Sequence, residues 1–174
     1  MHTTIPATAI DIYRSLPEGT RCEVLYNQLI MTPAPNTSHQ FLSVKLSSRL
    51  FVYLEETKKG IILEAPTDLY LTELQSVVQP DIMVIMEKNR SLIYEDGVHG
   101  APDIIFEILS GNHIHDTVKK KSLYEEAGVK EYFVIDPSSK MVVMFALNAS
   151  GKYDIVYERP GKITSGILAT SFDI

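Results

Sequence analysis

The segment that decides the fold is Pro102-Asp-Ile-Ile-Phe-Glu-Ile-Leu109. Its apolar run predicts a strand that is covered on both faces, as in the sheet of an α/β protein. Glu107 interrupts this run. Because an ionised carboxylate is very costly to bury alone, Glu107 predicts a counter-charge or a metal ion close to this strand.

A second strand-like run supports the same interpretation. The segment Val77–Met86 carries one acidic residue, Asp81, directly after Pro80 and at the polar end of the strand. Two isolated carboxylates on neighbouring buried strands predict a metal site, since Mg²⁺ and Mn²⁺ prefer oxygen ligands.

Length, charge and cysteine content restrict the class of protein. The 174 residues predict one domain, 1–174, which can bury about two-thirds of the surface of its unfolded chain. The single cysteine, Cys22, has no partner within the chain and no secretory leader is visible, so we expect a cytoplasmic protein. No apolar run reaches membrane-spanning length. The net charge of -6 disfavours broad binding to nucleic acid, although carboxylates that hold a cation add to that negative total.

Glycine and proline positions predict a mixed α/β (α+β) domain built on a mixed sheet. Four leucines at four-residue spacing predict a long helix, which Thr37 and Gln40 open as a capping box. The first hairpin turns near Asn27, which tolerates positive φ. The expected elements are a helix over Ala9–Leu16, a hairpin over Arg21–Met31, a helix from Thr37 to Lys58–Gly60, strands over Ile61–Leu69, Val77–Met86 and Pro102–Leu109, a helix over Asp116–Ala127, a strand over Glu131–Asp136, and a C-terminal hairpin of Met141–Leu147 with Tyr153–Tyr157.

The helix expected over 116–127 places one lysine on its apolar side. Steps of three and four residues put Lys120 on the same face as Leu123 and Tyr124, and they put the two neighbouring lysines off that face. The preceding strand offers Glu107 as its partner. A structural salt bridge explains this arrangement as well as a catalytic role does.

Other polar residues give weaker signals. Glu23, taken alone, fits a solvent-facing strand residue, and Gln40 has a structural task as the capping partner of Thr37. His39 lies in the first turn of the long helix, where an imidazole can contact a ligand. His113 and His115 alternate before the next helix, but two histidines without a further clear ligand are a weak zinc signal.

Several enzyme classes lack their motifs in this chain. Neither a phosphate-cradling glycine-rich loop nor a dinucleotide fingerprint occurs, so no nucleotide cofactor is expected. A serine-hydrolase elbow is also missing, and Cys22 has no histidine-containing context typical of a nucleophile. Two carboxylates and one lysine remain as the chemical signature.

Short motifs run through nearly the whole chain in a specific order. They are Leu16–Gly19, Cys22–Leu25, Met31–Pro35, His39-Gln40, Gln79–Ile82, Gly100–Ser110, Asp116, Lys120, Tyr124 and Ala127–Pro137. In this order and spacing the chain resembles the Uma-two family of restriction endonucleases, a domain-of-unknown-function group in the PD-(D/E)XK nuclease superfamily.

The resemblance implies a restriction-endonuclease-like core of helix, three strands, helix and strand, with one hairpin at each end. It implies that Asp81 and Glu107 bind metal and that Glu23 is an accessory carboxylate. In the superfamily a lysine stands two residues after the second acid, where this chain has Leu109. The family's own pattern implies that Lys120 has taken over the role of that lysine.

The resemblance also implies an activity and its partners. We expect an endonuclease that hydrolyses phosphodiester bonds of nucleic acid, with DNA as substrate, using Mg²⁺ or Mn²⁺ held by Asp81, Glu107 and the Ile108 carbonyl. His39, Gln40 and Tyr124 are expected to line the substrate cleft. The loop before the second helix departs from the family's pattern, because it has Asn112, His113 and His115 in place of the basic residues that would contact substrate.

The superfamily also suggests a homodimer. Apolar residues of the terminal hairpin that we expect to be exposed, Val142, Met144 and Tyr157, offer a two-fold interface. Two other functions stay open from the sequence. One is a non-catalytic protein-binding or dimerisation module that keeps the charged residues as a buried ion-pair network, and the other is a metal-dependent hydrolase of small phosphoesters.

Overall fold

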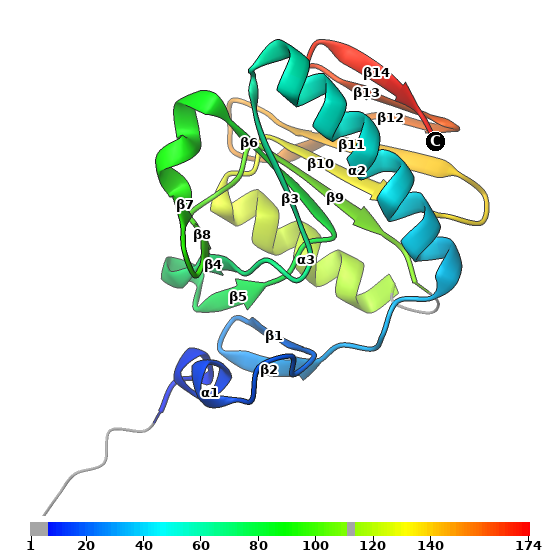
Figure 1. Ribbon diagram of the computed structural model, residues 1–174. Coiled ribbons are helices and arrows are strands. Elements are labelled where there is room, and N and C mark those ends of the chain that lie inside the picture. The colour runs from blue at the N-terminus through cyan, green and yellow to red at the C-terminus, as the bar shows by residue number, and fades with distance from the viewer. Residues whose placement is uncertain (1–6, 111–113) are drawn as a thin grey trace, which may run out of the picture.

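The chain folds around a main mixed sheet, with a second sheet beneath it (Figure 1). The computed structural model describes residues 7–110 and 114–174, and it describes side chains of the second range from Val118 onward. The elements are α1 Ala9–Ser15, β1 Cys22–Leu25, β2 Gln28–Met31, α2 Thr37–Thr57, β3 Gly60–Glu64, β4 Leu69–Leu71, η1 Thr72–Leu74, β5 Ser76–Val78, β6 Ile82–Met86, η2 Glu87–Leu92, β7 Ile93–Tyr94, β8 Gly97–His99, β9 Ile104–Ile108, α3 Ile114–Ala127, β10 Glu131–Ile135, β11 Met141–Leu147, β12 Tyr153–Pro160, β13 Lys162–Ser165 and β14 Thr170–Asp173.

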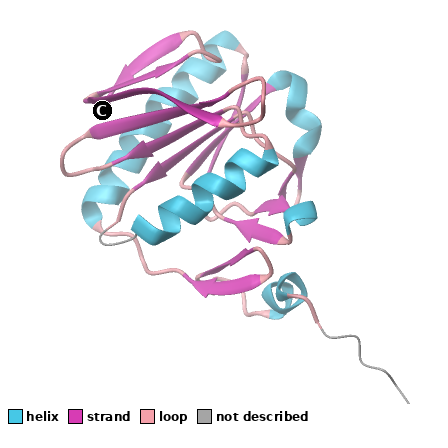
Figure 2. Cartoon of the chain, turned by 180° about the vertical axis from the view of Figure 1, so that it is seen from behind, coloured by secondary structure: helices cyan, strands magenta, loops and turns pink. Residues whose placement is uncertain are grey.

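The main sheet has the strand order β12-β11-β10-β9-β6-β3, and the second sheet has the order β2-β1-β5-β4-β8-β7. Within the main sheet β9 and β10 are parallel, and α3 is the crossover between them. The order α2, β3, β6, β9, α3, β10 is the expected series of helix, three strands, helix and strand. Helices α2 and α3 cover opposite faces of the main sheet (Figure 2).

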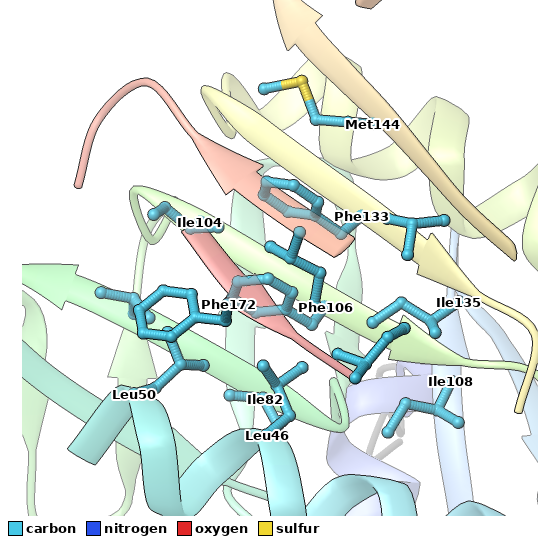
Figure 3. Packing of buried hydrophobic residues seen from close by; sticks show 14 of the residues in the cluster. Leu46, Leu50, Ile82, Ile104, Phe106, Ile108, Phe133, Ile135, Met144 and Phe172 are labelled. Carbon is cyan, nitrogen blue, oxygen red and sulfur yellow. The ribbon is translucent and has the colours of Figure 1, made fainter. Parts of the chain in front are cut away.

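Strand β9 shows why both faces of the main sheet are apolar. Ile104, Phe106 and Ile108 point to the α2 side, where they pack with the leucines of that helix (Figure 3). Ile105 joins the other core, beneath α3. Because side chains alternate along a strand, Glu107 also faces the α3 side. The predicted burial of this strand on two faces is confirmed.

The predictions of two continuous strands are wrong, because a proline divides each of them into two shorter strands. The segment 61–69 divides at Pro66 into β3 of the main sheet and β4 of the second sheet, and the segment 77–86 divides at Pro80 into β5 and β6. Proline has no N–H for a strand ladder, so the chain can leave one sheet at this point and enter the other. The two crossings are adjacent, since Ala65 N donates to the Asp81 carbonyl at 3.2 Å.

Helix α2 begins one residue away from the predicted capping box. The N-cap is Asn36, whose Oδ1 accepts from His39 N at 2.9 Å, and Thr37 is the first helical residue. Gln40 therefore is not the capping partner of Thr37. The leucine stripe is confirmed as the buried face, and the helix ends at Thr57, before Lys58 takes a left-handed conformation with φ 53°.

The C-terminal region differs most from the prediction. After the expected hairpin of β11 and β12, a further hairpin of β13 and β14 packs on the same core. It helps to bury Val142 and Met144, so these two side chains are not the exposed dimer surface that the sequence suggested. Tyr157 is half-buried and donates its hydroxyl to the Thr164 carbonyl at 3.1 Å. Among the described residues, no helix is long and apolar enough to cross a membrane.

Candidate functional site

Asp81 lies at the crossing between the two sheets, directly before β6. Its Oδ2 accepts from the Ile108 N–H at 2.7 Å and from His39 Nε2 at 3.0 Å. The backbone donor comes from the end of β9, and the imidazole comes from the first turn of α2. These two contacts fix one carboxylate oxygen of Asp81 and leave Oδ1 for another partner.

Glu107 projects from β9 toward α3. Its Oε1 accepts from the Tyr124 hydroxyl at 2.7 Å and from Lys120 Nζ at 3.2 Å. Burial raises the pKa of Glu107 to about 7, and the charges of Asp81 and Glu23 act in the same direction against that of Lys120. Folding therefore favours the protonated form of the Glu107 carboxyl group.

Lys120 occupies the centre of the site, as the helical stripe predicted. Its Nζ lies 2.9 Å from Glu23 Oε1 and 3.2 Å from Glu107 Oε1, and its side chain is 13% exposed. Burial acts to lower the pKa of this ammonium, but the Glu107 and Glu23 carboxylates outweigh burial and raise it. Lys120 is therefore a fixed positive charge across the working pH range.

Glu23 is buried, with 4% exposure, so the expectation of a solvent-facing strand residue is wrong. The reason is the second sheet, which places β1 beneath the end of the main sheet. Besides Lys120, the Gln79 N–H donates to Glu23 Oε1 at 2.7 Å. Two carboxylates that are far apart in the sequence, Glu23 and Glu107, thus bind one lysine, and Asp81 lines the same cavity.

The three residues expected to contact substrate have different environments. His39 is buried; burial lowers the pKa of its imidazole, but the contacts with Asp81 outweigh burial and raise it. Tyr124 is fully buried and donates its hydroxyl hydrogen bond to Glu107. Gln40 is exposed on the cavity wall, so it is the one of these three that is open to a large ligand.

A cavity of about 990 Å³ opens above these side chains. Its walls come from the α1–β1 region, the start of α2 and the two sheet crossings, and its floor includes Asp81, Glu107 and Lys120. Residues 111–113 and the side chains of residues 114–117, which include His113, His115 and Asp116, lie outside the described part of the chain.

The carboxylate oxygens fit a hard divalent cation. Oδ1 of Asp81 and Oε2 of Glu107 and Glu23 accept no hydrogen bond from the described part of the chain. The described residues contain no group of three or more His, Cys, Asp or Glu side chains that by itself could hold a metal ion. Mg²⁺ does not require such a cage, because it keeps several waters and uses one or two carboxylates together with substrate phosphate.

Sequence reasoning missed two backbone donors that organise the site. The N–H groups of Ile108 and Gln79 each hold one carboxylate oxygen. No side-chain pattern predicts such contacts. The Gln79 side chain also forms a hydrogen bond, which it donates to Asp68 Oδ1 at 2.8 Å. The position of Gln79 directly before Pro80 was the one sequence feature that could have drawn attention to this residue.

Comparison with known proteins shows the family and the fold of the chain. The sequence profile of the Uma2 family, described as "Putative restriction endonuclease", matches residues 10–169. The chain belongs to the Uma2 family. The crystal structure of "a putative nuclease belonging to DUF820" from Anabaena variabilis ATCC 29413 is similar, with a TM-score of 0.76 and 18% identity over 94% of this chain and 92% of that chain. This likeness shows the shared fold. A search of curated proteins gave no match.

Proposed function

We propose that this Uma2 protein is a Mg²⁺- or Mn²⁺-dependent endonuclease that hydrolyses phosphodiester bonds of nucleic acid, with DNA as substrate. The observation that supports this most strongly is that Lys120 binds both Glu23 and Glu107 in a cavity that Asp81 also lines. The family description and the restriction-endonuclease-like order of helices and strands point the same way.

In this proposal Asp81, Glu107 and the Ile108 carbonyl hold the metal ion. When bound, the ion supplies Lewis-acid chemistry: it polarises a phosphate oxygen and lowers the pKa of water. The protein's part is to hold the oxygen ligands in place. His39 and the Ile108 N–H do this for Asp81, and Tyr124 does it for Glu107.

Lys120 supplies the fixed positive charge. Held by Glu23 and Glu107, it donates a hydrogen bond to the phosphate oxygen on which negative charge increases in the transition state. Because the ammonium is already oriented by two carboxylates, little reorganisation is needed as the charge develops. Glu23 Oε2 is available to accept a hydrogen bond from the attacking water.

A second candidate function has one specific observation in its favour. Lys120 pairs with both Glu23 and Glu107, so these two buried carboxylates share a counter-charge without a metal ion. A non-catalytic protein-binding or dimerisation module with the same fold would need no more than this. Hydrolysis of a small phosphoester is a third outcome that the same experiment can reveal.

The homodimer remains part of the proposal, on another surface. Large apolar side chains of α2 are exposed and replace the terminal hairpin as the candidate contact: Phe41, Val44, Phe51 and Val52. Light scattering at micromolar concentration tests this, and a single monomeric species would remove the dimer from the proposal.

The test of the activity is a titration of Mg²⁺ and Mn²⁺ with DNA, RNA and a nitrophenyl phosphodiester in parallel. We expect metal-dependent cleavage of nucleic acid by the wild type and none by Asp81→Asn. Asp96→Asn makes the same charge change at an exposed carboxylate paired with His99 and serves as the control. Cleavage that persists in Asp81→Asn, or hydrolysis of the small diester alone, would contradict the proposal.

A further inference from the structure

The arginines of this chain divide into two groups. Of the five, Arg49, Arg90 and Arg159 donate hydrogen bonds to other groups of the protein. The other two, Arg14 and Arg21, are exposed and form no ion pair with any described carboxylate. Both of them line the cavity above Asp81 and Glu107. Arg14 and Arg21 therefore lie at the candidate site without an ion pair to a described carboxylate.

The positions of these two arginines are defined by the α1–β1 region. Arg21 precedes β1, and its carbonyl accepts from Thr32 N at 3.0 Å, which extends the pairing of the hairpin. Residues two apart on an extended chain point to the same side, so the side chains of Arg21 and Glu23 lie on the same face of the hairpin. The Arg14 guanidinium lies 5.3 Å from the centre of the Tyr70 ring, which holds it at the cavity wall.

Carboxylates outnumber cations among the described residues of the cavity wall. Arg14, Arg21 and Lys120 face six carboxylates, and Lys120 is already held by two of these. The carboxylates are Glu18, Glu23, Glu64, Asp68, Asp81 and Glu107. A metal ion at Asp81 and Glu107 would offset the negative charge of these two carboxylates but not that of the others. Such a wall suits a ligand that presents a few phosphates and repels one that presents many.

The depth of the site restricts the ligand further. The side chains of Glu23 and Glu107 are only 5% and 12% exposed, so a phosphate must enter the cavity to meet them. Duplex DNA is a stiff rod with a persistence length of about 50 nm, and it resists the bend that would bring one phosphate into a cavity. A single strand bends easily.

Building on the proposed function, we propose that the cavity takes one single strand of nucleic acid, either free or displaced from a duplex. Arg14 and Arg21 bind phosphates on one side of the scissile bond. The α1–β1 region is then the substrate clamp, and strand separation precedes cleavage of any duplex substrate.

The test compares binding of a short fluorescein-labelled single-stranded oligodeoxynucleotide with binding of the blunt duplex of the same sequence, by anisotropy, with Ca²⁺ in place of Mg²⁺ and again in EDTA. We expect the wild type to bind the single strand at least about tenfold more tightly. Arg14→Gln and Arg21→Gln should each lower the slope of log K against log salt by about 0.7 for the single strand. Arg90→Gln, which removes an exposed arginine paired with Glu87, should leave the slope unchanged.

The outcomes separate this inference from the proposed function. Equal or tighter binding of the duplex, slopes that do not change in both cavity variants, or no binding of either probe would overturn the single-strand clamp. Single strands that bind as expected but are not cut with Mg²⁺ or Mn²⁺ would overturn the nuclease and leave the clamp. Duplex cleavage at the wild-type rate by Arg14→Gln and Arg21→Gln would overturn the clamp and leave the nuclease.

Discussion

The ammonium group of Lys120 lies 2.9 Å from Oε1 of Glu23, although 97 positions separate the two residues in the chain. This contact ties α3, which packs on the main sheet, to β1 of the second sheet. It also leaves a positive charge at the place where a phosphate would meet the carboxylates. The same lysine is therefore both a structural link and the candidate electrostatic group of the reaction.

Replacement of Lys120 by methionine should lower metal-dependent cleavage by about a hundredfold or more, the effect of losing one preorganised electrostatic contact. Lys119→Met and Lys121→Met should cost far less, since Lys119 is exposed and Lys121 lies over the Phe145 ring. Single-turnover rates at saturating metal compare the three variants. Equal losses would indicate a diffuse basic patch and would contradict the assigned role.

Glu107 should make the stability of the metal-free protein depend on pH. Its pKa rises from the ordinary 4.5 to about 7 on folding, so the folded state holds this proton more tightly than the unfolded state. The stabilisation is complete below about pH 4.5 and is lost as pH rises through about 7, with a slope of at most about 1.4 kcal/mol per pH unit. Urea denaturation in EDTA measures this, and the slope of Glu107→Gln in the same window should be smaller.

His39 should act on the metal through Asp81. Its loss in His39→Ala leaves Asp81 Oδ2 with only the Ile108 N–H as a donor, so Mg²⁺ or Mn²⁺ affinity should fall by about 10- to 100-fold. Titration calorimetry measures the change directly. His99→Ala removes an imidazole of β8 that pairs with Asp96 rather than with Asp81, and it should leave metal affinity unchanged. Equal effects of both variants would contradict the role of His39.

The N-cap assignment of α2 can be tested by two neighbouring alanine substitutions. Asn36→Ala should lower the free energy of unfolding by about 1 kcal/mol, because the His39 N–H loses its acceptor. Thr37→Ala should change it by less than about 0.5 kcal/mol. The reverse order in chemical denaturation would restore the capping box that the sequence suggested.

The local patterns of the sequence predicted the elements that carry the site. The leucine stripe of α2, the doubly buried β9 and the inward face of α3 all follow from periods of 3.6 and 2, so Glu107 and Lys120 could be paired before the structure was known. The turn at Asn27, with φ 61°, follows from the tolerance of asparagine for that conformation.

The missing information concerned contacts between distant segments. Nothing local indicates that Pro66 and Pro80 mark crossings between two sheets, because proline also ends strands in ordinary turns. Local sequence predicted an exposed Glu23, but the second sheet buries it. It also predicted that Val142 and Met144 are exposed, but the hairpin of β13 and β14 covers them. These are consequences of tertiary packing, which a short window of sequence does not contain.

The two adjacent crossings at Pro66 and Pro80 divide the candidate site between two sheets. Asp81 and Glu107 belong to the main sheet, whereas Glu23 and the α1–β1 region belong to the second sheet. In the proposals above, Arg14, Arg21 and Glu23 act on the substrate from the α1–β1 region, whereas Asp81 and Glu107 would hold the metal ion at the main sheet. Lys120 joins the two groups, because it pairs with Glu23 as well as with Glu107.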